Sequence, residues 1–176
     1  RSDKKAGGGC VMDYAAHVLN LINYICSSPI VKVAGTSMHS IFSAEVDDAV
    51  YSTLTLENGL KGQLSVCWSD DTVRKMTTSL KIEGDGGKIF VDATTLKVYV
   101  QEDNPKEGLV KGWNEKHIPE LAPIVFFNLR GEEYSEETDK FIKCIKENKM
   151  SDRNSFEEAY KTDQIINALM EDAKNG

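Results

Sequence analysis

The chain has 176 residues, a formal net charge of −7 and 40% hydrophobic residues, which is the composition of an ordinary globular domain. The negative charge argues against nucleic acid or an anionic membrane as the main partner, because both require a basic surface. No apolar run approaches the roughly 18 residues of a membrane span, and the polar start RSDKK is not a secretory signal. The four cysteines have no zinc spacing, so we expect reduced thiols in a cytoplasmic protein.

The first predicted element is a helix over residues 11–26, directly after three glycines at residues 7–9. At 100° per residue, a stripe about 60° wide holds four polar side chains: Asp13, His17, Asn20 and Tyr24. Nearly every other residue of the helix is apolar. We therefore expect a buried helix whose polar stripe faces a partner, a cavity or a substrate.

Alternating apolar and polar residues predict a series of strands after this helix. They cover residues 30–39, 49–57, 60–69, 75–83, 88–92 and 96–101. Asn58-Gly59 separates the second strand from the third, and this pair predicts a type I′ turn. Gly84-Asp85-Gly86-Gly87 predicts a tight turn and not a phosphate-binding loop, because a strand follows it. Strands spaced this closely predict an antiparallel sheet with one buried face.

The remainder of the chain predicts one more strand and two helices. We expect residues 102–120 to be irregular, residues 123–130 to form a strand, and residues 136–148 and 156–174 to form helices. Ser155 and Glu158 have the spacing of a capping box at the last helix. The whole order predicts an α+β fold in a single domain over residues 1–176: a mainly antiparallel open sheet with helices packed on one face.

Asp13 and His17 are the residues best suited to chemistry, because side chains four residues apart on a helix are neighbours. A carboxylate beside an imidazole orients the ring and favours its protonated form, which suits general acid–base catalysis. A buried pair that serves only packing explains the same spacing equally well. A metal site is less favoured, since the sequence offers no third ligand.

Other positions carry weaker signals. The three glycines form either a flexible entry or a loop of close backbone approach, and without GxGxxG they are not a dinucleotide fingerprint. Trp68 stands at a strand end, where it lies either in the core, which is the simpler interpretation, or beside a pocket. His39 and His117 are interpreted as surface histidines. Nucleophilic catalysis has no support, because no Ser or Cys has a base and an orienting group.

Several segments together resemble the C-terminal domain of the Gfo/Idh/MocA oxidoreductases, which include glucose–fructose oxidoreductase and inositol dehydrogenase. The resemblance rests on Gly-Gly-x-x-x-Asp-x-x-x-His, the Asn-Gly hairpin ending in Trp68-Ser69, residues 84–88, and residues 127–135, 141 and 162–166. It covers nearly the whole chain, and the helix with Asp13 and His17 is its most specific part.

This resemblance implies an enzyme in two parts. An N-terminal Rossmann domain, absent from this chain, would bind NAD or NADP, so no cofactor-binding residue is expected here. The present domain would hold a sugar, polyol or sugar nucleotide and join subunits into a homo-oligomer through its sheet. His17 would be the acid or base at the substrate hydroxyl, and Asp13 would position the substrate or tune His17. The residues expected to contact the substrate are Asn20, Tyr14, Gly9 and Trp68.

Some features depart from the family pattern. The Rossmann fingerprint and the family's catalytic lysine, in a Glu-Lys-Pro motif, are missing, so the isolated chain is expected to be inactive. Ala15 stands where the family commonly has Gly, and Asn20 where it often has Asp, which leaves the substrate class open. The alternative is a non-catalytic module, either a sheet-mediated homodimer or a ligand-binding domain. A self-contained hydrolase or isomerase is the weakest interpretation.

Overall fold

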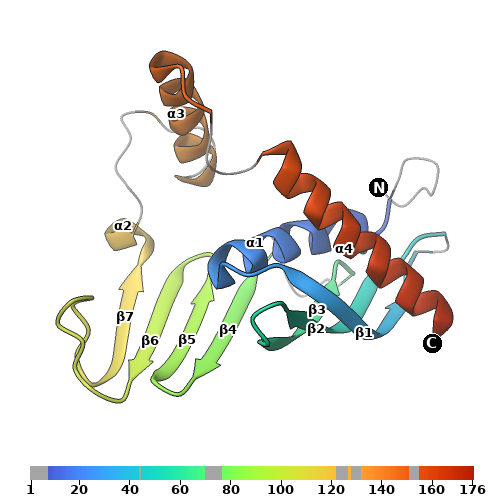
Figure 1. The fold of residues 1–176 in the computed structure, drawn as a ribbon, viewed down its shortest axis with the longest axis horizontal. Coiled ribbons are helices and arrows are strands. Elements are labelled where there is room, and N and C mark those ends of the chain that lie inside the picture. The colour runs from blue at the N-terminus through green and yellow to red at the C-terminus, as the bar shows by residue number, and fades with distance from the viewer. Residues whose placement is uncertain (1–7, 44, 70–76, 122–126, 128–131, 151–154) are drawn as a thin grey trace. The chain divides into compact units, whose positions relative to one another are not determined.

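The computed structural model describes residues 8–43, 45–69, 77–121, 127, 132–150 and 155–176 (Figure 1). The chain divides into two compact units. One unit comprises Arg1–Arg74 and Asp152–Gly176, and the other comprises Lys75–Ser151. Each unit is described by itself. Within the described residues, no helix is long and apolar enough to cross a membrane.

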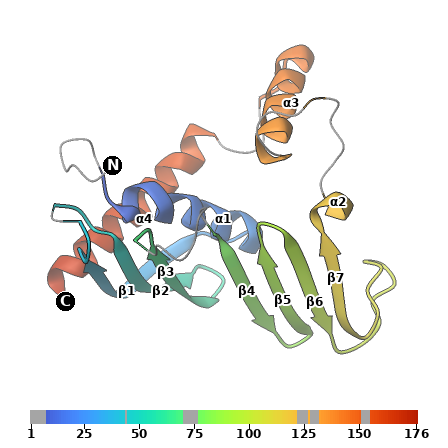
Figure 2. The ribbon, with the colours of Figure 1, turned by 180° about the vertical axis from the view of Figure 1, so that it is seen from behind.

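The first unit combines helical segments from both ends of the chain with one sheet. Its elements are η2 (Val11–Ala15), α1 (Ala16–Cys26), β1 (Ile30–His39), β2 (Ala49–Leu56), β3 (Lys61–Cys67) and α4 (Phe156–Asn175). The strands are antiparallel in the order β1-β2-β3. Helix α4 packs along β1 and also contacts α1, and both views show the two helices beside this sheet (Figures 1 and 2).

The core of the first unit lies where these helices meet the sheet. The strands bury Val50, Leu54, Leu56, Leu64 and Val66, while the helices bury Val11, Leu19, Ile165, Ile166 and Leu169. Burying one such side chain fully is worth about 1.5–3 kcal/mol, so this contact orients both helices on the sheet. The capping box at the start of α4 is confirmed: Ser155 Oγ accepts the Glu158 N–H at 3.2 Å, and Glu158 reaches back to the Ser155 N–H.

A polar contact joins the end of α4 to an irregularity in β1. The register of β1 against β2 shifts between Ala34 and Ser37. There the N–H of the buried Thr36 donates to Asp172 Oδ2 at 2.7 Å, and the Thr36 and Ser52 hydroxyls lie 2.8 Å apart. Hydrogen bonds from Thr36 lower the pKa of Asp172, so its carboxylate is charged at neutral pH.

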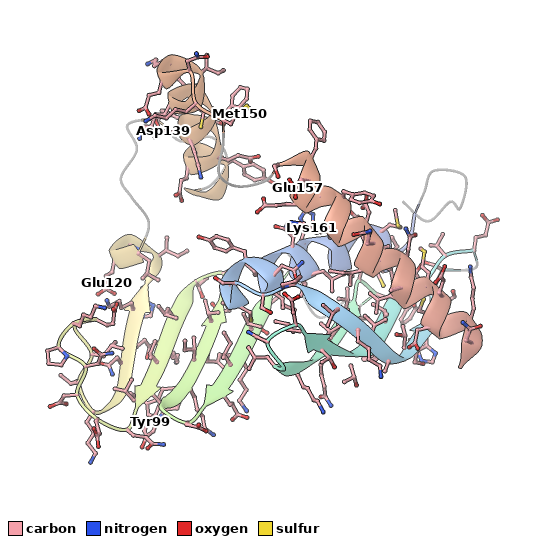
Figure 3. The ribbon with its side chains drawn as sticks, viewed as in Figure 1. Tyr99, Glu120, Asp139, Met150, Glu157 and Lys161 are labelled. Carbon is pink, nitrogen blue, oxygen red and sulfur yellow. The ribbon has the colours of Figure 1, made fainter. Side chains whose placement is uncertain are left out.

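The second unit is a four-stranded antiparallel sheet with two helices. Its elements are β4 (Ser79–Gly84), β5 (Gly87–Asp92), β6 (Thr95–Val100), β7 (Gly112–His117), α2 (Ile118–Leu121) and α3 (Glu132–Glu147), with the strands in chain order. Six half-buried apolar side chains share one face: Leu80, Ile82, Ile89, Val91, Leu96 and Val98. The opposite face carries Phe90, Tyr99 and Trp113 among ion pairs such as Lys97–Glu115 at 3.3 Å. Figure 3 labels Tyr99 on this sheet.

The predicted α+β class with antiparallel strands is confirmed, and the described strands form two sheets. The expectation that residues 102–120 are irregular was wrong, because they contain β7 and α2. In β7 the exposed Trp113, Glu115 and His117 alternate with Asn114 and Lys116, so the strand has no apolar face to reveal it. The strand predicted over residues 123–130 lies, apart from Phe127, outside the described residues.

The turn between β2 and β3 also differs from its prediction. A type I′ turn needs positive φ at both central residues, but only Gly59 has it, with φ of 88°. Four residues connect the strands, and the Asn58 side chain accepts the Leu60 N–H at 3.1 Å. The longer loop relieves Asn58 of the left-handed conformation that a two-residue turn would impose.

Candidate functional site

The helix with Asp13 and His17 begins against Asp47, in the loop between β1 and β2. The Cys10 N–H donates to the Asp47 carbonyl oxygen at 2.8 Å, and the Val11 N–H donates to Asp47 Oδ2 at 2.8 Å. Gly9 is buried with φ of 120°, and a Cβ there would overlap the Asp47 carboxylate. The glycine run therefore permits a close approach at Gly9, and the group that approaches is Asp47.

The first turn of this helix is wider than predicted. Residues Val11–Ala15 form a π-helix, and the α-helical pattern starts at Ala16. Asp13 thus lies in the π turn and His17 in the α-helix. A π turn within an α-helix is rare and often occurs at functional sites. Asp13 and His17 stay on one continuous helix, but the angle between them is not that of a regular α-helix.

The expectation that this helix is buried on nearly every side was wrong. Its buried residues are Val11, Ala15, Leu19 and Ile22. Asp13 and Asn20 are half-buried, His17 and Tyr24 are exposed, and Met12 and Ile25 are 44% and 39% exposed. One side of the helix packs against the sheet and α4. On the polar side His17 and Tyr24 are exposed, whereas Asp13 Oδ2 is buried.

Tyr14 and Trp68 meet beside the same helix. Their rings are 5.8 Å apart and perpendicular, which is a favourable edge-to-face arrangement, and both side chains are half-buried. The backbone N–H of Trp68 donates to the Asp48 carbonyl oxygen at 3.0 Å, which fixes the end of β3. The structure therefore brings Tyr14 and Trp68 together, and Trp68 is neither fully in the core nor fully exposed.

The loop before β2 is organised by the side chain of Asp48. This carboxylate is completely buried and accepts the N–H groups of Ile41, Phe42 and Ser43 at 2.8, 2.6 and 2.8 Å. Burial opposes its ionisation, but these donors and the Ser69 hydroxyl outweigh burial and lower the pKa of Asp48. Asp48 is therefore charged at neutral pH, and it holds the loop from which Asp47 reaches the helix.

Asp47 and Asp48 were not singled out from the sequence. The available signal was a pair of acids placed directly before an apolar strand, and acids in that position are usually only solvated. Their contacts reach Val11, 36 residues earlier, and Trp68, which follows β3. Nothing in the local pattern predicts contacts of that range.

The buried thiol of Cys10 lies next to Asp47. Burial, followed by a hydrogen bond with Asp47 and the negative charges of Asp47 and Asp48, raises the pKa of Cys10 far above its usual value. A thiol in this environment stays protonated and is a poor nucleophile.

The start of this helix does not fit the phosphates of a dinucleotide. Two N–H groups that would face a phosphate already donate to Asp47, and the carboxylate would repel a second anion. In the part of the chain that the structure describes, no group of three His, Cys, Asp or Glu side chains could hold a metal ion.

The chain shares its fold with half of several oxidoreductases of known structure. The oxidoreductase domain protein from Kribbella flavida matches with a TM-score of 0.75 and 18% identity, over 96% of this chain and 49% of that one. Levoglucosan dehydrogenase in complex with NADH and levoglucosan matches with a TM-score of 0.77 and 22% identity, over 97% of this chain and 49% of that one. The aldose–aldose oxidoreductase from Caulobacter crescentus complexed with glycerol matches with a TM-score of 0.69 and 17% identity, over 97% of this chain and 47% of that one.

These similarities define the fold of the chain, and the chain spans about half the length of these proteins. A family model described as the GFO/IDH/MocA C-terminal domain matches residues 1–90. The chain belongs to this family, which confirms the resemblance seen in the sequence. A search of curated proteins finds no match.

Proposed function

We propose that this chain is the substrate-binding and oligomerisation part of a cytoplasmic, NAD- or NADP-dependent oxidoreductase for a sugar, polyol or sugar nucleotide. Its family and its span of about half of proteins such as levoglucosan dehydrogenase, solved with NADH, support the proposal. The observation that carries it is the polar stripe of the helix, on which the exposed His17 follows the half-buried Asp13. Both compact units belong to this one functional part, and a separate domain would hold the cofactor.

Each proposed site residue has a role that suits its surroundings. The exposed His17 ring takes the proton of a substrate hydroxyl, and the half-buried Asp13 carboxylate positions the substrate or the ring. The Tyr14–Trp68 pair offers an aromatic edge for the apolar face of a sugar, and the Asn20 amide offers hydrogen bonds. Gly9 supports the site through Asp47. When bound, the nicotinamide accepts the hydride.

Oligomerisation is proposed to use the aromatic face of the sheet β4–β7. Phe90 and Trp113 on this face are 44% and 61% exposed, and the Tyr99 and Trp113 rings are 5.4 Å apart. Aromatic side chains at the centre of a patch with charged residues around them are typical of protein interfaces. A second copy of this chain is the proposed occupant. The same face is what favours the alternative function, a non-catalytic sheet-mediated dimer.

The test compares the native protein that contains this chain with residues 1–176 alone. Each is assayed for reduction of NAD⁺ and NADP⁺ with levoglucosan, glucose and myo-inositol. We expect the native protein to be longer by roughly 120–200 residues, one domain, and to reduce a nicotinamide with at least one of these compounds. The isolated chain should reduce neither. A native protein without a cofactor domain would contradict the proposal and favour the non-catalytic module.

A further inference from the structure

We propose that Asp47 is a positioning residue for the Asp13–His17 pair, acting through the first turn of their helix. The inference rests on the proposed function and names a residue beyond those expected to touch substrate. Asp47 itself is half-buried and reaches the helix from the loop between β1 and β2. Its role would be to set where the helix begins, and so where His17 stands.

The helix depends on Asp47 for its N-terminal hydrogen bonds. The residue at the N-cap position is Cys10, whose side chain caps no N–H group of the helix. Instead the Cys10 and Val11 N–H groups donate to the carbonyl and the carboxylate of Asp47, both at 2.8 Å. A helix start with no cap of its own is usually free to fray. Here a residue 36 positions away provides the cap.

Gly9 shapes the place that Asp47 occupies. The carboxylate lies where a Cβ of residue 9 would be, with Asp47 Cγ only 2.9 Å from that position. With φ of 120°, the Gly9 backbone is in a conformation that other residues rarely adopt. The contact between the two residues therefore leaves no room for a side chain at position 9.

The adjacent Asp48 ties the same loop to the other side of the site. Its N–H donates to the His39 carbonyl oxygen at 2.8 Å, and its carbonyl oxygen accepts the Trp68 N–H at 3.0 Å. Trp68 in turn contacts Tyr14 on the helix. Two neighbouring acids thus hold the helix and the strand end that carry the proposed site residues, which is what a positioning element has to do.

The π turn explains why the loss of this anchor would matter to His17. Asp13 and Tyr14 lie in the π turn, while His17 lies beyond it. A π turn is less favourable than an α turn and persists only where surrounding contacts hold it. Without the Asp47 carboxylate, we expect the first turn to fray or to return to α-helical geometry. Either change moves Asp13 relative to His17.

The experiment uses the full-length enzyme and three substitutions. Asp47→Ala removes the acceptor, Asp47→Asn retains one oxygen for the Val11 N–H, and Asp163→Ala changes an exposed acid on α4 as the control. For each we measure cofactor Kd, and kcat and KM with the fastest of levoglucosan, glucose and myo-inositol. Hydrogen exchange of residues 10–17 is followed by mass spectrometry.

For Asp47→Ala we expect kcat to fall on the order of 10- to 100-fold, as displaced catalytic groups do, with cofactor Kd unchanged. Exchange in residues 10–17 should accelerate, and Asp47→Asn should restore most of kcat. A kcat of Asp47→Ala equal to that of Asp163→Ala would overturn the inference, whatever happens to thermal stability. Should Asp47→Ala not fold, a kcat of Asp47→Asn more than 100-fold below wild type would also overturn it, because the retained oxygen should suffice.

Failure of the proposed function gives a different pattern. In that case His17→Ala keeps wild-type turnover, or the full-length protein turns over none of the three compounds. Hydrogen exchange is then the only measurement that tests whether Asp47 anchors the start of the helix. Unchanged exchange of residues 10–17 in Asp47→Ala would overturn the anchoring, and accelerated exchange would support it.

Discussion

Gly9 and Asp47 fit together so closely that the Asp47 carboxylate occupies the space of any side chain at position 9. The contact joins the start of the helix with Asp13 and His17 to the loop before β2. A side chain at position 9 would therefore disturb the start of the helix and the loop together.

Gly9→Ala should destabilise the protein, because alanine brings a Cβ against Asp47 and a strained positive φ. We expect a loss of about 1–3 kcal/mol in the free energy of unfolding, measured by urea denaturation. Gly62→Ala is the control, since a Cβ at Gly62 on β3 meets no atom within 4 Å. Equal urea midpoints for the two variants would show that the Gly9–Asp47 fit is not tight in solution.

The stabilising effect of Asp48 should depend on pH. The pKa of Asp48 is lowered in the folded protein, so the carboxylate contributes stability above its unfolded pKa, and this contribution is lost as the pH falls through the folded value. Asp48→Asn puts amide N–H groups against backbone N–H donors. The difference in urea midpoint from wild type should be large near pH 7 and shrink towards about pH 3.

The control for this substitution is Glu57→Gln, which changes an exposed acid just after β2. Its midpoint should follow that of wild type at both pH values. A constant difference between wild type and Asp48→Asn across the pH range would mean that the three N–H donors do not depend on the charge of Asp48.

Trp68 should affect substrate affinity more than turnover. Trp68→Ala removes the aromatic edge that it forms with Tyr14, and the loss of such a contact raises KM about 3- to 10-fold. The control is Tyr160→Ala, because Tyr160 is an aromatic residue that is 62% exposed on α4 and belongs to neither proposed surface. Equal KM values for the sugar in both variants would remove Trp68 from the binding site.

The aromatic face of β4–β7 should control subunit association. Trp113→Glu places a charge among Phe90 and Tyr99 and should shift the native protein to smaller oligomers, as measured by light scattering over a concentration series. Val110→Glu is the control, because Val110 is also exposed and precedes the same strand. An unchanged mass distribution for Trp113→Glu would exclude this face as the interface.

The sequence predicted those elements whose patterns are local. β1 has the predicted bounds, and the capping box at Ser155 marks the start of α4, because alternation and capping depend on residues close together in the chain. β7 was not predicted, because both faces of this strand carry polar residues. The π turn could not be predicted either, because the contacts to Asp47 that accompany it come from another part of the chain.

The same distinction applies to the site. The spacing of Asp13, Tyr14 and His17 places them on one helix, and the structure agrees. The proximity of Trp68 to Tyr14 and the role of Asp47 at Gly9 depend on contacts between distant segments. Exposure differs from the prediction for a related reason: a helix that is apolar on nearly every side was expected to be buried apart from its polar stripe, whereas Met12 and Ile25 are exposed.

The central claim is that His17 transfers a proton in a nicotinamide-dependent oxidation. Its most direct test is kcat of His17→Ala in the full-length enzyme, beside cofactor Kd, with the exposed His117 replaced by alanine as the control. We predict that His17→Ala abolishes turnover and leaves cofactor affinity nearly intact, while His117→Ala behaves like wild type. Turnover by His17→Ala at the wild-type rate would contradict the account.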